Sequence, residues 1–460
     1  MAAIPGSIET DQQPPMTVPL RHFVVGLGFL LAGVAIGFGV AEGAVTGLGR
    51  LAHVHVLLAG WICITIMGAM TQFVPVWSGT QLHSRRLATV QLVLVATGLA
   101  GFATALILSV VSFLPVFGVL MLAGFWTFAY NIARTLVTVE TWGVTERHFA
   151  LALGFFLLLT VLGLVLATDL SRSILAGSGI THVQLLEAHA TLAVFGAVLT
   201  TVYGALYQLG TMFTQTELHG IDGPLRSIEE LGHPTGVVLL AVGRLLDGVL
   251  LAQIGGALVV VAALAFCTIL ARKLWEMQVD WTPMHTRYAV VVPMLTAWAL
   301  LTAPAWLDDP TRYDRLFGAP GVRHLLLIGG IGFVVFGTLY HIVPFVVWVH
   351  RYSDRLGYEA VPMIDDLYDD RLAALDGAFL IGGTVALVAA DLLVAPAAVR
   401  SVGGILVGLG VLVFGTNVSL VLRDHSPYTF DRLLLGSLSP RRSNDEPATT
   451  EQNRPSAPDR

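Results

Sequence analysis

The chain has 460 residues, of which 55% are hydrophobic and only 12% are charged. A soluble domain carries about 25% charged residues, so this composition excludes an ordinary water-soluble fold and indicates a protein that is solvated by membrane lipid. The net charge of −6 is modest, and no run of basic residues predicts a nucleic-acid partner.

Apolar runs of about 20 residues, the length that a helix needs to cross a bilayer, follow one another along the chain. They are continuously apolar rather than alternating, which excludes a membrane β-barrel. We predict an all-α, polytopic membrane bundle of about twelve transmembrane helices. The predicted spans are 20–42, 50–77, 86–110, 113–139, 147–168, 181–210, 233–246, 249–273, 285–306, 322–349, 372–395 and 398–422.

The two ends of the chain are polar and rich in proline, a composition typical of disorder. We therefore expect a disordered N-terminal segment over 1–18, a single transmembrane domain over 19–425 and a disordered cytoplasmic tail over 426–460.

The seventh span is short, with an apolar stretch only from Thr235 to Gly243. Charge decides whether it crosses the membrane, because short positively charged loops face the cytoplasm. With twelve spans, one set of basic residues lies on a single side, and with eleven the set is divided at Arg272. We therefore predict twelve spans in the cell membrane with both termini cytoplasmic. The set is Arg85, Arg86, Arg147, Arg226, Arg272, Lys273, Arg287, Arg351, Arg355, Arg371 and Arg423.

Three of the predicted spans share one pattern of histidine, small and polar residues. The second span reads His55, Gly60, Gly68, Gln72 and Pro75, and the tenth reads His324, Gly329, Gly337, His341 and Pro344 at identical spacings. Aligning Gly204 of the sixth span with Gly68 places His189 opposite His53. The spans are four apart, so the sequence predicts a pseudo-threefold internal repeat of four-helix units.

The histidines of this repeat are candidate ligands. Glycines alone would only let membrane helices approach closely, but ionisable side chains inside spans are usually functional. Zinc favours a compact set of three or four ligands, whereas a haem needs an axial histidine from one or both sides and an apolar cleft. We predict that His53, His55, His189 and His324 bind haem iron, as b-type haem in one or two copies.

Haem propionates at the outer surface would need cationic partners, and arginine binds carboxylates in bidentate fashion. Three arginines fall at that edge of the predicted bundle: Arg50, Arg323 and Arg400. We predict that they contact the cofactor.

Twelve spans with histidines at the outer ends of the second, sixth and tenth resemble subunit I of the haem–copper oxidase superfamily, over about residues 20–422. The chain is also similar to NnrS-like haem membrane proteins. The resemblance implies a low-spin haem between His324 and either His53 or His55. This chain lacks the family's histidine pair after the sixth span, where Gly243-Arg-Leu-Leu-Asp-Gly stands, so copper is not supported by visible ligands.

Two residues along a helix correspond to a rotation of about 200°, so His53 and His55 point into different clefts. If the order of the repeats follows the oxidase family, His53 meets His324 and His55 meets His189. The hypothesis is therefore two bis-histidine sites.

These features favour an integral-membrane b-type haem protein in respiratory electron transfer, with a cupredoxin-type or cytochrome c-type subunit, or quinol, as electron donor. One alternative is an enzyme, a terminal O₂ or NO reductase with an atypical active site, for which no catalytic residue is assigned. Others are a haem-based gas sensor, a haem-handling protein and a solute transporter. Transporters typically show two repeats with helices broken near the membrane midplane.

Overall fold

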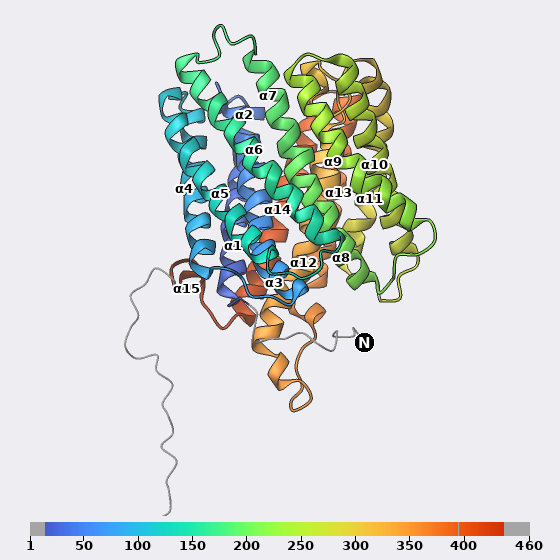
Figure 1. Cartoon of the computed structure of the whole chain (residues 1–460). Coiled ribbons are helices and arrows are strands. Elements are labelled where there is room, and N and C mark those ends of the chain that lie inside the picture. The colour runs from blue at the N-terminus through green and yellow to red at the C-terminus, as the bar shows by residue number, and fades with distance from the viewer. Residues whose placement is uncertain (1–13, 394, 437–460) are drawn as a thin grey trace, which may run out of the picture.

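A computed structural model describes residues 14–393 and 395–436, and these form helices and loops without a β-strand (Figure 1). The all-α prediction is confirmed. The long helices are α1 Thr17–Ala41, α4 Arg85–Ile107, α5 Leu114–Leu136, α6 Val144–Arg172, α9 Asp222–Leu245, α10 Val249–Trp275, α11 Pro283–Asp308, α13 Asp370–Leu392 and α14 Ala397–His425. Three further spans are composite: α2 Gly49–His55 with η2 Val56–Cys63 and α3 Ile64–Ser78; α7 His182–Thr191 with η4 Leu192–Leu199 and α8 Thr200–Thr214; η6 Leu325–Gly332 with α12 Phe333–Arg351.

Eleven of these helices, within the described residues, are long and apolar enough to cross a membrane. The remaining long helix, α9, has 24 residues, which is about 36 Å of helix and enough to span the hydrocarbon layer. Counting α9, the bundle has twelve spans in chain order, and each lies close to a predicted range. The chain is therefore a polytopic helical membrane protein.

The predicted start of the seventh span is wrong, because α9 begins at Asp222 rather than at residue 233. Its first half is polar, but that polarity is satisfied inside the bundle. Asp222 accepts a hydrogen bond from Nε of Arg272 at 2.8 Å, and Glu229 accepts one from Nε2 of His148 at 3.1 Å. A prediction from apolar runs misses a helix whose polar face is paired with its neighbours.

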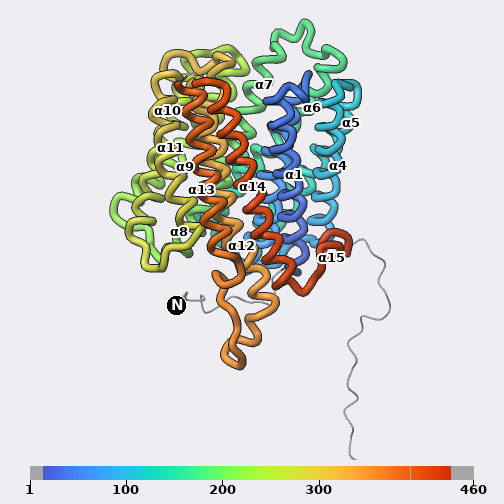
Figure 2. The backbone as a smooth tube through the Cα atoms, turned by 180° about the vertical axis from the view of Figure 1, so that it is seen from behind, coloured from blue at the N-terminus to red at the C-terminus, as the bar shows by residue number. Residues whose placement is uncertain are grey.

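Spans two, six and ten are the axis of the bundle. They are the most buried of the apolar spans: 67%, 78% and 78% of the residues in their apolar 18-residue stretches are buried inside the bundle. The other spans surround them, and α1 packs against α14, so that the first and last spans close the ring (Figure 2). We refer to these three as the axial spans.

The pseudo-threefold repeat is visible in the backbone itself. Each axial span contains a π-helical segment: Val56–Cys63, Leu192–Leu199 and Leu325–Gly332. These segments occupy the same position of the repeat, beginning directly after His55, Thr191 and His324. Extended π-helix is rare and often lies at functional sites, and the sequence pattern did not predict it.

The glycines of the repeat make equivalent contacts. A Cβ added to Gly60, Gly196 or Gly329 would lie 2.7–2.8 Å from a side-chain atom of the preceding repeat helix. The three neighbours, Phe29, Phe155 and Met294, are themselves at equivalent positions of α1, α6 and α11. The repeat therefore extends from the axial spans to the helices that precede them.

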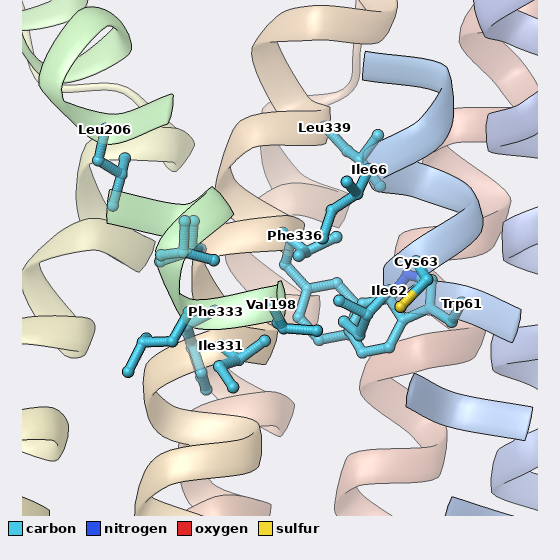
Figure 3. Packing of buried hydrophobic residues seen from close by; sticks show 14 of the residues in the cluster. Trp61, Ile62, Cys63, Ile66, Val198, Leu206, Ile331, Phe333, Phe336 and Leu339 are labelled. Carbon is cyan, nitrogen blue, oxygen red and sulfur yellow. The ribbon is translucent and has the colours of Figure 1, made fainter. Parts of the chain in front are cut away.

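The middle of the axis is a packed apolar core (Figure 3). Trp61 of span two packs against Phe336 of span ten, with ring centroids 4.7 Å apart and planes inclined by 41°. Val198 of span six and Phe333 of span ten lie in the same cluster. This core fixes the three axial spans against one another and so fixes the outer ends, where the histidines lie.

Parts of both chain ends that we predicted to be disordered are ordered in the structure. Within 14–18, Met16 and Val18 are buried and α1 begins at Thr17. Within the tail, α15 (Phe430–Leu435) lies against α1, and Nε of Arg21 donates to the carbonyl oxygen of Leu433 at 2.6 Å. The predicted disordered segments are therefore too long at both boundaries, and their remaining parts, 1–13 and 437–460, lie outside the described residues.

Candidate functional site: two histidine pairs

The axial spans divide the bundle into three sectors, named 2–6, 6–10 and 10–2 after the two spans that border each. In Figure 1 the histidine-bearing helices α2 and α7 lie at the end of the bundle opposite α15. We call the α15 end the inner end and the histidine end the outer end.

In sector 2–6, His55 and His189 face each other. Their ring centroids are 6.5 Å apart and their planes are inclined by 18°. Metal–imidazole nitrogen bonds are about 2 Å long, so two imidazoles that share one metal ion have centroids about 6 Å apart. The separation in this structure therefore suits one metal ion between the two rings.

In sector 10–2, His53 and His324 are close enough to interact electrostatically. His324 also has a carboxylate beside it, because its Nδ1 lies 2.9 Å from a carboxylate oxygen of Asp391 on α13. The side chain of Asp391 is only 5% exposed. His55 and His189 thus have neighbouring rings, and His53 and His324 lie within electrostatic range of each other; we refer to them as the two pairs. No cluster of three or more His, Cys, Asp or Glu ligands occurs among the described residues.

The protein backbone sets the tautomer of three of these rings. Nδ1 of His53 donates to the carbonyl oxygen of Gly33 at 2.8 Å, and Nδ1 of His189 donates to that of Leu159 at 2.8 Å. Nδ1 of His55 donates to the carbonyl oxygen of Leu51 at 2.9 Å. A neutral imidazole whose Nδ1 carries the proton presents an unprotonated Nε2, the state in which histidine binds a metal.

Two glycines make room for histidine rings at equivalent places in the repeat. A Cβ on Gly37 of α1 would lie 2.6 Å from Cε1 of His53, and a Cβ on Gly163 of α6 would lie 2.9 Å from Cε1 of His189. Any side chain at either position would displace the ring. These glycines therefore position the two histidines rather than simply allow helices to approach.

The packing around the pairs is incomplete. Every residue of Ile36–Val40 on α1 and of Leu162–Val165 on α6 retains exposed surface. These stretches of α1 and α6 are thus less tightly packed than the axial spans, and the donor set, two imidazoles without a third ligand, is the kind that haem iron takes.

Sector 6–10 lacks a histidine pair. Thr191 and Val322 stand at the repeat positions that hold histidines in the other sectors. Arg244 of α9 lies in this place, 1% exposed. Its Nη1 donates to Oγ1 of Thr191 at 2.7 Å, and its other donors bind the carbonyl oxygens of Pro310 and Arg315 at 3.0 and 3.1 Å.

Aromatic side chains complete the filling of sector 6–10. Trp298 and Trp306 of α11 are 0% and 1% exposed. Both pack on Phe195 of span six, with ring centroids 5.7 and 5.6 Å apart. The guanidinium of Arg244 lies 5.4 Å from the ring centroid of Trp306. The third sector is thus closed by protein side chains.

Two of the three predicted propionate partners lie together. Nη2 of Arg400 is 2.8 Å and Nη2 of Arg323 is 3.5 Å from the carboxylate of Asp391, and both side chains are more than half exposed. They therefore stand at the outer rim beside His324. Arg50 is exposed and has no ion pair or hydrogen bond to its side chain among the described residues, so the structure does not bring it to the other two.

Sequence reasoning missed Asp391, Arg244, Gly37 and Gly163. Asp391 is an ionisable residue within an apolar span, and that signal alone marks a functional candidate. Gly37 and Gly163 occupy equivalent repeat positions, which extending the repeat comparison to the first and fifth spans would have revealed.

No known family model matches the chain, and no curated protein sequence is significantly similar to it. The fold and site themselves define a twelve-span helical membrane protein with two internal histidine pairs near one end.

Proposed function

We propose that this chain is an integral-membrane b-type cytochrome that carries electrons through two haems, one bound by His53 and His324 and the other by His55 and His189. The observation that carries the proposal is the His55–His189 pair. Its ring separation of 6.5 Å suits a shared metal ion, and each Nδ1 is engaged by a backbone carbonyl. When bound, haem b supplies a one-electron Fe(III)/Fe(II) couple.

Non-covalent haem is favoured over c-type haem. The chain has only two cysteines, Cys63 and Cys267, and covalent attachment uses a CxxCH motif. Both cysteines are buried in the structure. The chain's own role would be to hold the imidazoles that bind the cofactor and to keep water out with apolar neighbours such as Phe102, whose ring centroid lies 5.2 Å from that of His55.

Electron transfer is favoured over reduction of O₂ or NO. A reductase needs an open coordination position, whereas a histidine on each side leaves none in sectors 2–6 and 10–2. Sector 6–10 offers Arg244, Trp298 and Trp306 where ligands would be needed. Under this proposal the chain is a relative of haem–copper oxidase subunit I whose third sector is filled by side chains.

The electron donor is expected at the outer end. The histidine pairs lie there, and the positive-inside rule places this end away from the cytoplasm. A cupredoxin, a cytochrome c or a quinol in the outer leaflet would each reach it. Both chain termini are then cytoplasmic.

The test is the visible spectrum of the full chain, purified from haem-replete cells, together with the haem content per chain. We expect two b-type haems with the sharp reduced α-bands of low-spin iron and little CO binding. His189→Ala should convert one haem to a high-spin, CO-binding form or remove it, and leave the other intact. His324→Ala should do the same to the second haem.

The matched control is His182→Ala. His182 is on the same helix as His189, but its Nδ1 bonds to Asp169 at 2.8 Å and it faces no second histidine. This variant should keep both haems. A colourless preparation, or an unchanged spectrum in His189→Ala, would refute haem ligation. Strong CO binding and rapid O₂ uptake by the unmodified protein would favour the reductase instead.

A further inference from the structure

An apolar cavity lies on the pseudo-threefold axis, in the inner half of the bundle. It is lined by residues of α3, α8 and α12 together with α1 and α6, is partly open, and has a volume of about 70 Å³. Equivalent residues of the three repeats form its wall. Two such sets are Ile66, Val202 and Val335, and Ala69, Ala205 and Thr338.

The burial pattern of the axial spans singles out this space. Over 60–75, 194–207 and 329–340, every residue is buried except Ala69, Ala205 and Thr338. These three stand at one position of the repeat, and their exposed surface faces the cavity. In Figure 3, Ile66 and Leu339, which both line the cavity, lie beside each other on neighbouring axial helices. The space is therefore a feature shared by all three repeats and not a local packing fault.

The wall is unsuited to water. A buried water needs two to four polar partners. Oγ1 of Thr201 instead donates to the carbonyl oxygen of Ala197 at 2.7 Å, and Oγ1 of Thr338 lies 2.7 Å from the hydroxyl of Tyr288. Oγ1 of Thr65 is the one hydroxyl of the wall without a hydrogen-bond partner among the described residues. The remaining lining is apolar.

The volume limits the size of an occupant. It is well above the roughly 10–15 Å³ that admits one water, and below the roughly 150 Å³ of an apolar cavity that takes up benzene or xenon. An occupant of one to three heavy atoms therefore fits, and a ring compound does not.

We propose that this cavity is a binding site for a small, uncharged, apolar molecule of the size of xenon or a diatomic gas. Such molecules concentrate in the lipid that surrounds the bundle. Thr65 follows His55 by about ten residues, or roughly 15 Å along a helix, so an occupant does not touch either proposed haem iron. The site is thus independent of the proposed function.

The test uses xenon as the probe. Crystals of the full chain are pressurised with xenon, and an anomalous difference peak is expected between α3, α8 and α12. Ala205→Leu should fill the cavity and abolish the peak, and Ala69→Leu is the second variant if Ala205→Leu does not fold. Ala35→Leu, at an exposed position of α1, is the matched control and should keep the peak.

Thermal stability gives a second readout. A ligand that binds only the folded state raises the melting temperature, so xenon pressure should raise it for the unmodified chain and for Ala35→Leu, but not for Ala205→Leu. Ordered water in the cavity, or no xenon peak under pressure, would overturn the proposal. The haem bands, recorded in the same samples, should not change when xenon is added. Absence of haem bands would refute the proposed cytochrome but would leave the xenon site untouched.

Discussion

The two histidine pairs differ in what lies behind each ring. Nδ1 of His55 and of His189 donates to a neutral backbone carbonyl, whereas Nδ1 of His324 faces the carboxylate of Asp391. A carboxylate behind a ligating imidazole raises the basicity of the ligand and so favours the more highly charged metal ion. The haem bound by His324 should therefore have its reduction potential lowered by Asp391.

Asp391→Asn tests whether the carboxylate of Asp391 lowers the reduction potential of the haem bound by His324. The variant should raise the reduction potential of the haem in sector 10–2, by about 60 mV if the relative affinity for ferric iron falls tenfold. The haem in sector 2–6 should keep its potential and acts as an internal reference. The measurement is a spectroscopic redox titration of the purified chain.

Asp169→Asn is the matched control for that titration, because a carboxylate oxygen of Asp169 lies 2.8 Å from Nδ1 of His182, away from either pair. It should leave both potentials unchanged. Equal shifts of both haems in Asp391→Asn would contradict a direct effect through His324.

At the scale of elements, α9 supplies the buried cation that distinguishes sector 6–10 from the other two sectors. Arg244 near its outer end donates to Thr191, Pro310 and Arg315. The helix reaches this position because its polar inner half is paired within the bundle, through Asp222 and Glu229.

Arg244→Met should destabilise the protein while preserving both haems. The substitution removes the Arg244 donor from Oγ1 of Thr191 and from the carbonyl oxygen of Pro310, and each unsatisfied group costs about 1–3 kcal/mol. The carbonyl oxygen of Arg315 keeps Nε1 of Trp306 as a donor. We expect a loss of about 2 kcal/mol or more, seen as a lower midpoint in thermal or denaturant unfolding, with unchanged haem spectra.

Arg312→Met provides the comparison, since the pair of Arg312 with Asp314 is about half exposed on both sides and such pairs contribute about 1 kcal/mol or less. If Arg244→Met instead removed a haem, sector 6–10 would have to take part in cofactor binding.

At the scale of the whole molecule, the even number of spans fixes the sidedness of the loops. Glu217 precedes α9 and Asp247 follows it, so the two residues lie on opposite faces of the membrane if α9 crosses. The chain has two native cysteines, and both are buried, which makes introduced cysteines selective reporters.

In intact cells, an impermeant maleimide should label Asp247→Cys but not Glu217→Cys. Glu217→Cys should become reactive only after the membrane is permeabilised. Labelling of both variants from outside would mean that α9 does not cross, which would place the two termini on opposite sides.

Much of the fold follows from hydropathy, because a lipid-facing helix must be apolar along its whole length. The predicted span 249–273 corresponds to α10 (Val249–Trp275), and 50–77 corresponds to α2 through α3 (Gly49–Ser78). The same rule fails for α9, whose first half is polar and paired inside the bundle. The π-segments also escape prediction, since their residues are as apolar as ordinary helix.

The sequence by itself determined the membrane bundle, its threefold repeat and the four outer histidines, because these depend on composition and spacing along the chain. The pairing of the rings could be proposed only by taking the order of the repeats from a resemblance, and the tertiary structure supplied the geometry of His55 and His189. Only the tertiary structure decided that Arg244 occupies the third sector and that Asp391 lies beside His324. Each of these contacts joins side chains on different spans. Which face a helix turns to its neighbours is set by packing across the whole bundle, and residue spacing within one helix does not contain it.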